Sequence, residues 1–246
     1  MHYLEKISTR APKHFSKTKI KAETEKLLGK IAERQKVLFA QKKFSLLIIL
    51  QGLDASGKDG LIGKVFTGLN PLGVSVKAFK QPTPEEAAHD FLWRVHAHAP
   101  EKGMISIFNR SHYEDVLVPR VNGDISTDKM TQRMRDINHF EQLLEHHDTV
   151  VLKFYLHISR EEQLDRLRER KTNPEKFWKH NDGDWETRRK WDKYVDVYQE
   201  IFQHCNHPEW HIIPADQNWY KEYLVSKKVY ETLKKLDLSY PGPPKD

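Results

Sequence analysis

Short apolar runs alternate with amphipathic stretches along the chain. The run FSLLIIL at 44–50 is almost wholly apolar, which is typical of a strand buried on both faces of a parallel sheet. Similar runs predict four more strands, at 73–79, 104–108, 149–158 and 210–215. Helical spacing of apolar residues predicts helices at 84–99, 127–147, 160–170 and 218–236. This alternation predicts right-handed crossovers and an α/β fold, with three α/β/α layers around a parallel five-stranded sheet.

Two segments stand apart from the alternation. About the first 20 residues read as an extended basic arm, and 23–43 has the spacing of an amphipathic helix, so 1–43 forms an N-terminal arm and helix. The segment 171–186 is polar, contains Pro and Gly, and is more typical of an insertion over a site than of a core element. We expect one domain over 1–246, with a helical lid at about 168–190.

The stretch GLDASGKDG, which follows the first strand, has the spacing of a phosphate-binding loop. In such a loop the backbone N–H groups and the N-terminus of the next helix, here LIGKVFTGLN, face the phosphate. Lys58 would hold phosphoryl oxygens. The remaining loop positions expected to bind phosphate or nucleotide are Gly52, Ala55, Ser56, Gly57, Asp59 and Gly60. An ordinary strand-to-helix turn is the alternative, and it leaves the lysine unexplained.

Two acidic residues in this loop would repel a bound phosphate unless a cation lay between them. Mg²⁺ fits, since it takes carboxylate and phosphate oxygens together and keeps several waters; Mn²⁺ is a second choice. We expect Asp54, which lies within the loop, to be a metal ligand or base. Asp59 stands where Ser or Thr is usual and could instead cap the helix or balance Lys64.

A second candidate constellation is FNRSHYED, at the end of the strand predicted at 104–108. The carboxyl ends of parallel strands line the ligand crevice, so these side chains should reach the site. Asn109 occupies the position of a Walker B acid, and Asp115 could restore the missing carboxylate. Arg110 could clamp a phosphoryl group or form a surface ion pair. For His112 we favour packing or hydrogen bonding over acid–base chemistry.

Basic residues supply a third set of candidates. The helix predicted at 160–170 carries four arginines, and Arg166 and Arg170 share one of its faces. One or two of the four could neutralise charge on a transferred phosphoryl group, while the rest are solvated. Lys64, Lys77, Lys80 and Arg120 are each ordinary surface charges when taken alone. Near a phosphate site they could together line a track for a long polyanion.

Composition narrows the class of protein. The chain has 246 residues and a formal net charge of +6, which suggests an anionic partner without choosing one. A single cysteine, Cys205, excludes an internal disulfide and favours a reducing cytoplasm. We see no signal peptide, membrane span or nucleic-acid motif, so we expect a cytoplasmic protein without membrane or nucleic-acid partners.

The motifs together resemble those of the family-2 polyphosphate kinases. GLDASGKDG, FKQP followed by HDFLWR, FNRSHYEDVLVPRV, YLHIS, RLRER and KWDKYVDVY occur in that family's order over about 20–240. The resemblance implies a P-loop kinase fold like that of thymidylate kinase. It also implies Mg²⁺-dependent, reversible transfer between inorganic polyphosphate and AMP, ADP or ATP, and a homodimer or homotetramer.

The resemblance implies specific roles. Asp54 would contact the metal and help activate the acceptor, Lys58 would hold the transferred phosphoryl group, and Arg110 and Arg170 would neutralise its charge. The residues that would face polyphosphate are Lys58, Lys64, Lys80 and Arg110. Arg120 would also face polyanionic substrate, and Arg120 and Asp115 would bind phosphate or nucleotide. With Asn109 at the Walker B position, the stretch FNRSHYEDVLVPRV resembles that of the subgroup that phosphorylates both AMP and ADP. The alternatives are an ATP-dependent nucleoside monophosphate kinase and a non-catalytic nucleotide-binding module.

Overall fold

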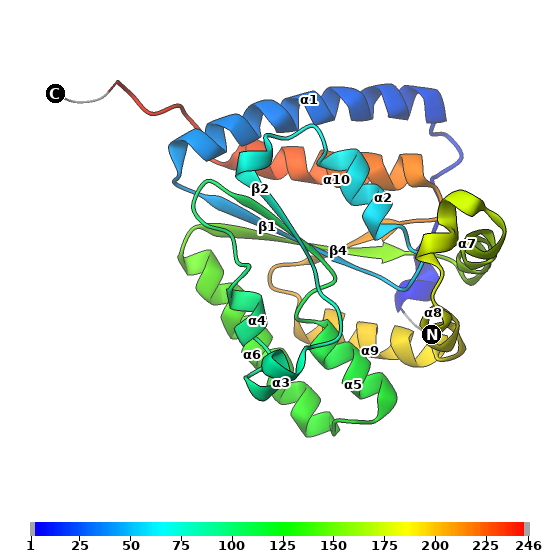
Figure 1. Ribbon diagram of the computed structural model, residues 1–246. Helices are drawn as coiled ribbons and strands as arrows, with labels where there is room; N and C mark the ends of the chain where they lie inside the picture. The colour runs from blue at the N-terminus through cyan, green and yellow to red at the C-terminus, as the bar shows by residue number, and fades with distance from the viewer. Residues whose placement is uncertain (1–2, 244–246) are drawn as a thin grey trace.

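A computed structural model describes residues 3–243 as helices on both sides of a five-stranded sheet (Figure 1). The strands are β1 Ser45–Gln51, β2 Val74–Ala78, β3 Ile105–Asn109, β4 Thr149–His157 and β5 Trp210–Pro214. Their order is β2-β3-β1-β4-β5 and every pairing is parallel. The predicted α/β fold and the five predicted strands are confirmed.

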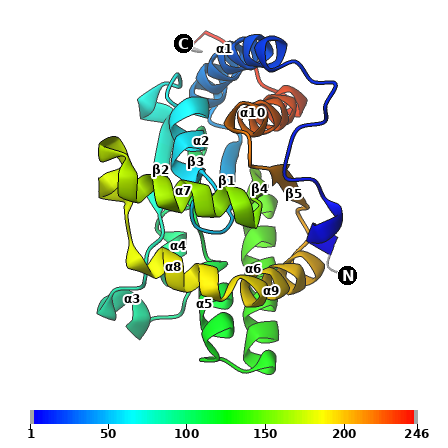
Figure 2. The ribbon, with the colours of Figure 1, turned by 90° about the vertical axis from the view of Figure 1, so that its right-hand side faces the viewer.

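Helices form the outer layers. The helices are α1 Lys17–Gln41, α2 Lys58–Val65, α3 Pro84–Ala88, α4 Trp93–His96, α5 Glu114–Asn122, α6 Thr127–His146, α7 Arg160–Thr172, α8 Asp182–Arg189, α9 Trp191–His204 and α10 Asn218–Lys235. Short 3₁₀ helices are η1 Tyr3–Lys6, η2 Pro71–Gly73 and η3 Pro174–Lys179. One face of the sheet carries α1, α2 and α10, and the other carries α4, α5, α6 and α9 (Figure 1). In the view turned by 90°, α7 and α8 lie across the end of the sheet (Figure 2).

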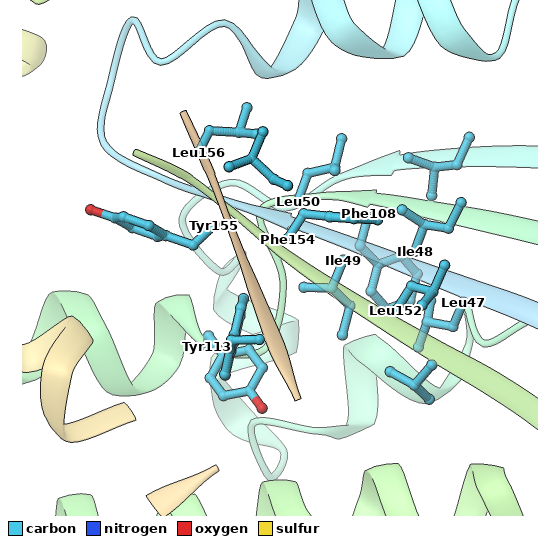
Figure 3. Packing of buried hydrophobic residues seen from close by; sticks show 14 of the residues in the cluster. Leu47, Ile48, Ile49, Leu50, Phe108, Tyr113, Leu152, Phe154, Tyr155 and Leu156 are labelled. Carbon is cyan, nitrogen blue, oxygen red and sulfur yellow. The ribbon is translucent and has the colours of Figure 1, made fainter. Parts of the chain in front are cut away.

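The central strand β1 explains why this sheet forms. All seven of its residues are buried, so its side chains pack against both helical layers. Leu47 and Ile49 lie among Leu152, Phe154 and Phe108 of the neighbouring strands (Figure 3). A continuous apolar strand buried in this way is stable only between two covering layers.

Two predicted helices have different bounds in the structure. The N-terminal helix begins at Lys17, so the predicted extended arm of about 20 residues is wrong over its last four residues. Ile20 explains the extra turn, because it packs against Tyr220 and Tyr223 of α10. The predicted helix 84–99 is also wrong: the Asp90 carboxylate accepts bonds from the backbone N–H groups of Leu92 and Trp93, which starts a new turn and separates α3 from α4.

A charged cluster lies wholly inside the layer between the sheet and α6. Glu141 Oε2 lies 2.7 Å from Lys153 Nζ, and both side chains are fully buried. Glu141 Oε1 accepts from Tyr113 Oη at 2.9 Å and lies 3.1 Å from His112 Nε2. Lys153 also donates to the backbone carbonyl of Cys205 at 2.8 Å. The prediction that His112 serves packing and hydrogen bonding is therefore confirmed.

Candidate active site

A cavity of about 970 Å³ opens at the carboxyl edge of the sheet. Its walls come from the loop after β1, the ends of β2 and β3, helix α5 and the segment from α7 to α8. This is the edge at which ligands bind in doubly wound sheets. The charged residues that line the cavity are Asp54, Lys58, Asp59, Lys80, Arg94, Arg110, Glu114, Asp115, Asp124, Arg170, Lys179 and Asp184.

The loop between β1 and α2 has the backbone of a phosphate cradle. Gly52 and Gly57 have φ of 147° and 91°, and Ala55 also has positive φ, at 61°. A Cβ at Gly52 would lie 2.8 Å from the backbone oxygen of Leu156, so a side chain is excluded there. The turn is closed by a hydrogen bond from Ser56 N to Leu53 O of 3.2 Å. The loop therefore delivers the first turn of α2 to the cavity.

Lys58, the first residue of α2, folds back into this loop. Its Nζ donates to the carbonyl of Gly52 at 2.7 Å and to that of Leu53 at 3.3 Å. Burial, with the nearby Arg110 charge, lowers the pKa of Lys58 to about 8, although Asp54 opposes the shift. The amino group is thus held at the floor of the cavity, where a bound phosphate would favour its charged form.

Asp54, Arg110 and Glu114 form a linked set above the loop. Arg110 forms ion pairs with the Asp54 carboxylate and, at 3.3 Å, with Glu114 of α5. Burial by itself raises the pKa of Asp54, but Arg110 and Lys58 outweigh it and hold that pKa below its usual value. Glu114 is the main cause that raises the pKa of Arg110. Asp54 is therefore an ionised carboxylate that borders the cavity.

The backbone aims Arg110 at this set. Arg110 follows the last residue of β3 and has a φ of 63°, in the left-handed region that non-glycine residues seldom adopt. Its N–H donates to Leu50 O at 3.0 Å, which joins the turn to β1. The sheet thereby holds the guanidinium beside the phosphate loop.

The second acid of the loop has a partner at the end of β3. Asn109 Nδ2 donates to Asp59 Oδ1 at 2.7 Å. This bond ties the side chain of Asp59 to β3. The alternative that Asp59 caps the helix is wrong, because the N-cap residue of α2 is Gly57 and no side-chain cap bond is formed there. The two residues form one polar wall of the cavity.

Further ion pairs close the remaining sides. Asp115 lies 2.8 Å from Arg94 Nη2, and Arg94 also contacts Glu86 at 3.4 Å. Burial raises the pKa of Asp115 despite this partner. On the opposite side Arg170 pairs with Asp184 of α8 and donates to the backbone carbonyl of Lys179 at 3.2 Å.

The charges around the cavity balance. Six cationic side chains face it: Lys58, Lys80, Arg94, Arg110, Arg170 and Lys179. Six carboxylates face it as well: Asp54, Asp59, Glu114, Asp115, Asp124 and Asp184. A polyanion that entered this cavity would therefore meet no net positive charge. It would need either a rearrangement of ion pairs or an added cation.

Most of the predicted site residues meet at this cavity. Those that line it are Asp54, Ala55, Gly57, Lys58, Asp59, Gly60, Lys80, Asn109, Arg110, Asp115 and Arg170. Gly52 and Ser56 lie in the loop behind the wall. Lys64 and Arg120 do not line the cavity, and Lys64 pairs with Glu25 of α1. Their predicted contact with polyphosphate has no support from this geometry.

Sequence reasoning missed several residues of the site. Arg94 falls in the HDFLWR stretch, whose position in the motif order was the available signal. Asp184 and Lys179 lie in the polar segment interpreted as an insertion, and nothing in its pattern separates them from solvated charges. Glu114 is next to Asp115 and was overlooked. Its role depends on the turn at Arg110, which no sequence pattern predicts.

The parallel sheet, the glycine-rich loop with its buried lysine and the charged cavity above it define a P-loop phosphotransferase. Such enzymes act mainly by positioning phosphates and compensating their charge. The model of the polyphosphate kinase 2 family matches residues 14–240. The chain belongs to this family.

Similar proteins agree with this placement. An AMP/ADP-polyphosphate phosphotransferase of Meiothermus ruber is 47% identical over 216 residues, which cover 87% of this chain and 81% of that one. An ADP-polyphosphate phosphotransferase of Rhodopseudomonas palustris is 38% identical over 226 residues, covering 86% and 78% of the two chains. The crystal structure of polyphosphate kinase 2 from Arthrobacter aurescens TC1 superposes with a TM-score of 0.93 at 36% identity, covering 99% of this chain and 89% of that one.

Within residues 3–243 no helix is long and apolar enough to cross a membrane.

Proposed function

We propose that the protein transfers a phosphoryl group from inorganic polyphosphate to AMP and to ADP, and that the reaction is reversible. The observation that carries this proposal is the set of Lys58, Asp54 and Arg110 at the floor of the cavity, in a chain of the polyphosphate kinase 2 family. In the transfer, an acceptor phosphate oxygen bonds to the terminal phosphorus of the polymer. The P–O bond to the next phosphate breaks, and the shortened polymer leaves with the negative charge.

The residues of the floor suit this step. Lys58 and Arg110 would hold the oxygens of the transferred group, whose charge spreads in the transition state. Arg170 would approach from the side of α7. Asp54, held ionised, would orient the acceptor oxygen. Lys80, Asn109, Asp59 and Asp115 would position the ends of the two substrates, together with the backbone N–H groups of the phosphate loop.

The carboxylates of the cavity fit Mg²⁺, or Mn²⁺ in its place. Asp54 has a lowered pKa and borders the cavity, while no group of three or more metal-binding side chains occurs among residues 3–243. Mg²⁺ commonly needs only one or two protein carboxylates, because phosphates and waters complete its shell. We therefore assign Asp54 as its protein ligand. Bound there, the ion would neutralise phosphate charge that the balanced cavity cannot.

The segment at about 168–190 would act as a lid. It contains the end of α7, η3 and α8, and it is held together by the Arg170–Asp184 pair. Arg188 Nη1 joins α8 to α7 through the Gln163 side chain at 2.9 Å, and Gln163 in turn donates to the backbone carbonyl of Asp54 at 3.0 Å. Movement of this unit would therefore shift the phosphate-binding loop through these hydrogen bonds. Exclusion of water beneath it would favour transfer over hydrolysis.

We further propose a cytoplasmic homo-oligomer, a dimer or tetramer, that also uses ATP in the reverse direction. Neither a membrane nor a nucleic acid is part of this proposal.

The test is a chromatographic nucleotide assay with Mg²⁺. AMP or ADP is supplied with either polyphosphate or ATP as the donor. ADP and ATP formed from AMP with polyphosphate alone would establish the proposed activity. Product from ADP but not from AMP would refute the proposal that AMP is an acceptor, which rests on Asn109. Turnover of AMP with ATP only would refute the proposed donor.

Two variants make the assay specific for the site. Asp54→Asn should lower the rate by about 10²-fold or more, since it removes the metal ligand while keeping its shape. Asn109→Asp should change the ratio of AMP to ADP turnover. Lys234→Met, on the exposed end of α10, is the matched control and should leave both rates unchanged.

A further inference from the structure

Two cations, the buried Lys221 and the partly buried Arg166, hold the phosphate-binding loop from behind. Arg166 of α7 donates to the backbone carbonyl of Ala55 at 3.0 Å, and also to those of Ala215 and Asp216. Lys221 of α10 donates to the carbonyl of Gly57 at 3.0 Å and lies 3.4 Å from that of Ser56. Lys221 is 1% exposed, and neither residue lines the cavity.

These bonds set the direction of the loop's peptide groups. In a trans peptide the C=O of one residue points opposite to the N–H of the next. The single cis bond among the described residues lies elsewhere, between His207 and Pro208. Because Lys221 draws the carbonyls of Ser56 and Gly57 towards α10, the N–H groups of Gly57 and Lys58 face away from α10. These are the groups that a phosphate would meet.

The contacts of Lys221 match those of an ammonium ion. An ammonium has three N–H donors and no acceptor, and three oxygens surround this Nζ: Gly57 O, Ser56 O and, at 3.0 Å, Asn218 Oδ1. A neutral amine has only two donors for them. Lys221 is also tightly fitted, since a Cβ on Gly57 would lie 2.3 Å from its Nζ.

We propose that Lys221 is a positioning residue that orients the phosphate-binding loop and lends it a positive charge when a phosphate chain binds. The proposal rests on the proposed polyphosphate substrate. Sequence spacing gives no hint of it, because Lys221 lies more than 160 positions beyond the loop.

The surroundings of Lys221 make its charge depend on the ligand. Burial, with the nearby Arg166 and Lys58, lowers the pKa of Lys221 to about 7. The charged groups that face it are Arg166 and Glu162 on α7, Lys58 on α2 and Glu222 on α10. A bound polyanion would favour the ammonium form, so binding would take up a proton near neutral pH.

The test is direct binding of inorganic polyphosphate by isothermal titration calorimetry from pH 6 to pH 9, without nucleotide. Lys221→Met keeps the length of the side chain but removes its charge and donors. We expect it to bind about tenfold more weakly than the unmodified protein at pH 6, the effect of losing one charged hydrogen bond. The difference should be smaller at pH 9, where Lys221 is already neutral in the free protein and keeps only two of its three donors.

Two companion variants complete the design. Lys221→Arg stays charged over this range and should bind tightly with a flatter pH profile. Lys234→Met, exposed on the same helix, should match the unmodified protein at every pH. At pH 7.5, titrations in buffers of different ionisation enthalpy should show less proton uptake for Lys221→Met than for the unmodified protein.

The outcomes separate the two proposals. An equal loss of affinity for Lys221→Met at pH 6 and pH 9 would show a purely structural role and overturn the inference. No loss at any pH would overturn it as well. If the unmodified protein bound no polyphosphate at any pH, the proposed substrate and the inference would fail together.

Discussion

The buried ion pair between Glu141 and Lys153 should be a main determinant of stability. Lys153→Met would leave a fully buried carboxylate with only Tyr113 and His112 as partners. Removing one member of a buried pair costs about 3–5 kcal/mol, because the other charge stays desolvated. For a chain of this length, each kcal/mol lowers the Tm by about 2–4 °C, so we expect a decrease of about 6–20 °C.

Urea denaturation and thermal scans of three variants measure this effect. The double variant Lys153→Met/Glu141→Leu removes both charges and should be more stable than Lys153→Met alone by about 2 kcal/mol or more. Lys234→Met, at an exposed position, should change stability by less than about 0.5 kcal/mol. A loss below about 1 kcal/mol for Lys153→Met, or a double variant as unstable as the single one, would refute this reasoning.

The Glu141–Lys153 pair also predicts that the stability of the fold depends on pH. Burial raises the pKa of Glu141, but His112 and Lys153 outweigh it and lower that pKa below its usual value. A lowered carboxyl pKa stabilises the fold above the unfolded-state pKa of about 4.3, and this stabilisation is lost as the pH falls through the folded-state pKa. In Lys153→Met the carboxyl takes up its proton at higher pH. The loss of stability of Lys153→Met relative to the unmodified protein should therefore be smaller at pH 4 than at pH 7.

Three further predictions concern the loop and the core. With subsaturating polyphosphate the rate should fall as the pH rises through about 8, the pKa of Lys58. Lys58→Arg, if it retains activity, should lose this part of the pH dependence and keep the part near pH 7 that Lys221 causes; a profile identical to that of the unmodified protein would contradict the role of the ammonium. Gly57→Ala should weaken polyphosphate binding at least tenfold in calorimetry, because its φ is 91° and its Cβ would displace Lys221; normal affinity would exclude a fixed cradle. Ile48→Ala, in the middle of β1, should cost about 2–5 kcal/mol in urea denaturation, and a cost below 1 kcal/mol would contradict a tightly packed sheet.

The fold was predictable because its signals are local. The run 44–50 is apolar enough to require burial on both faces, and the glycines that follow it mark the loop. The prediction of one helix over 84–99 was wrong because apolar spacing does not reveal the hydrogen bond that the Asp90 carboxylate accepts from the backbone. That bond ends one helix and begins a new turn. Apolar spacing also gave no reason to extend α1 back to Lys17, since the partners of Ile20 lie on α10.

The site was predictable only where its residues share a motif. Asp54 and Lys58 share one loop, and Asn109 and Arg110 follow one strand. Lys221 contributes from a helix at the other end of the chain, through backbone carbonyls that have no sequence signature. Lys64 shows the converse: it is one turn from the loop in sequence but lies on the side of α2 that faces α1.

The balance of six cations and six carboxylates around the cavity has a consequence for selectivity among polyanions. A patch of uncompensated lysines and arginines attracts RNA, DNA and heparin alike, because long-range attraction depends on net charge. A cavity of mutually neutralised pairs offers no such attraction. A competing polymer would have to break the Asp54–Arg110 and Arg94–Asp115 pairs without compensation. A phosphate chain that carries its own divalent cation brings the positive charge that compensates for the broken pairs. Such a chain would therefore bind in the cavity where other polyanions would not.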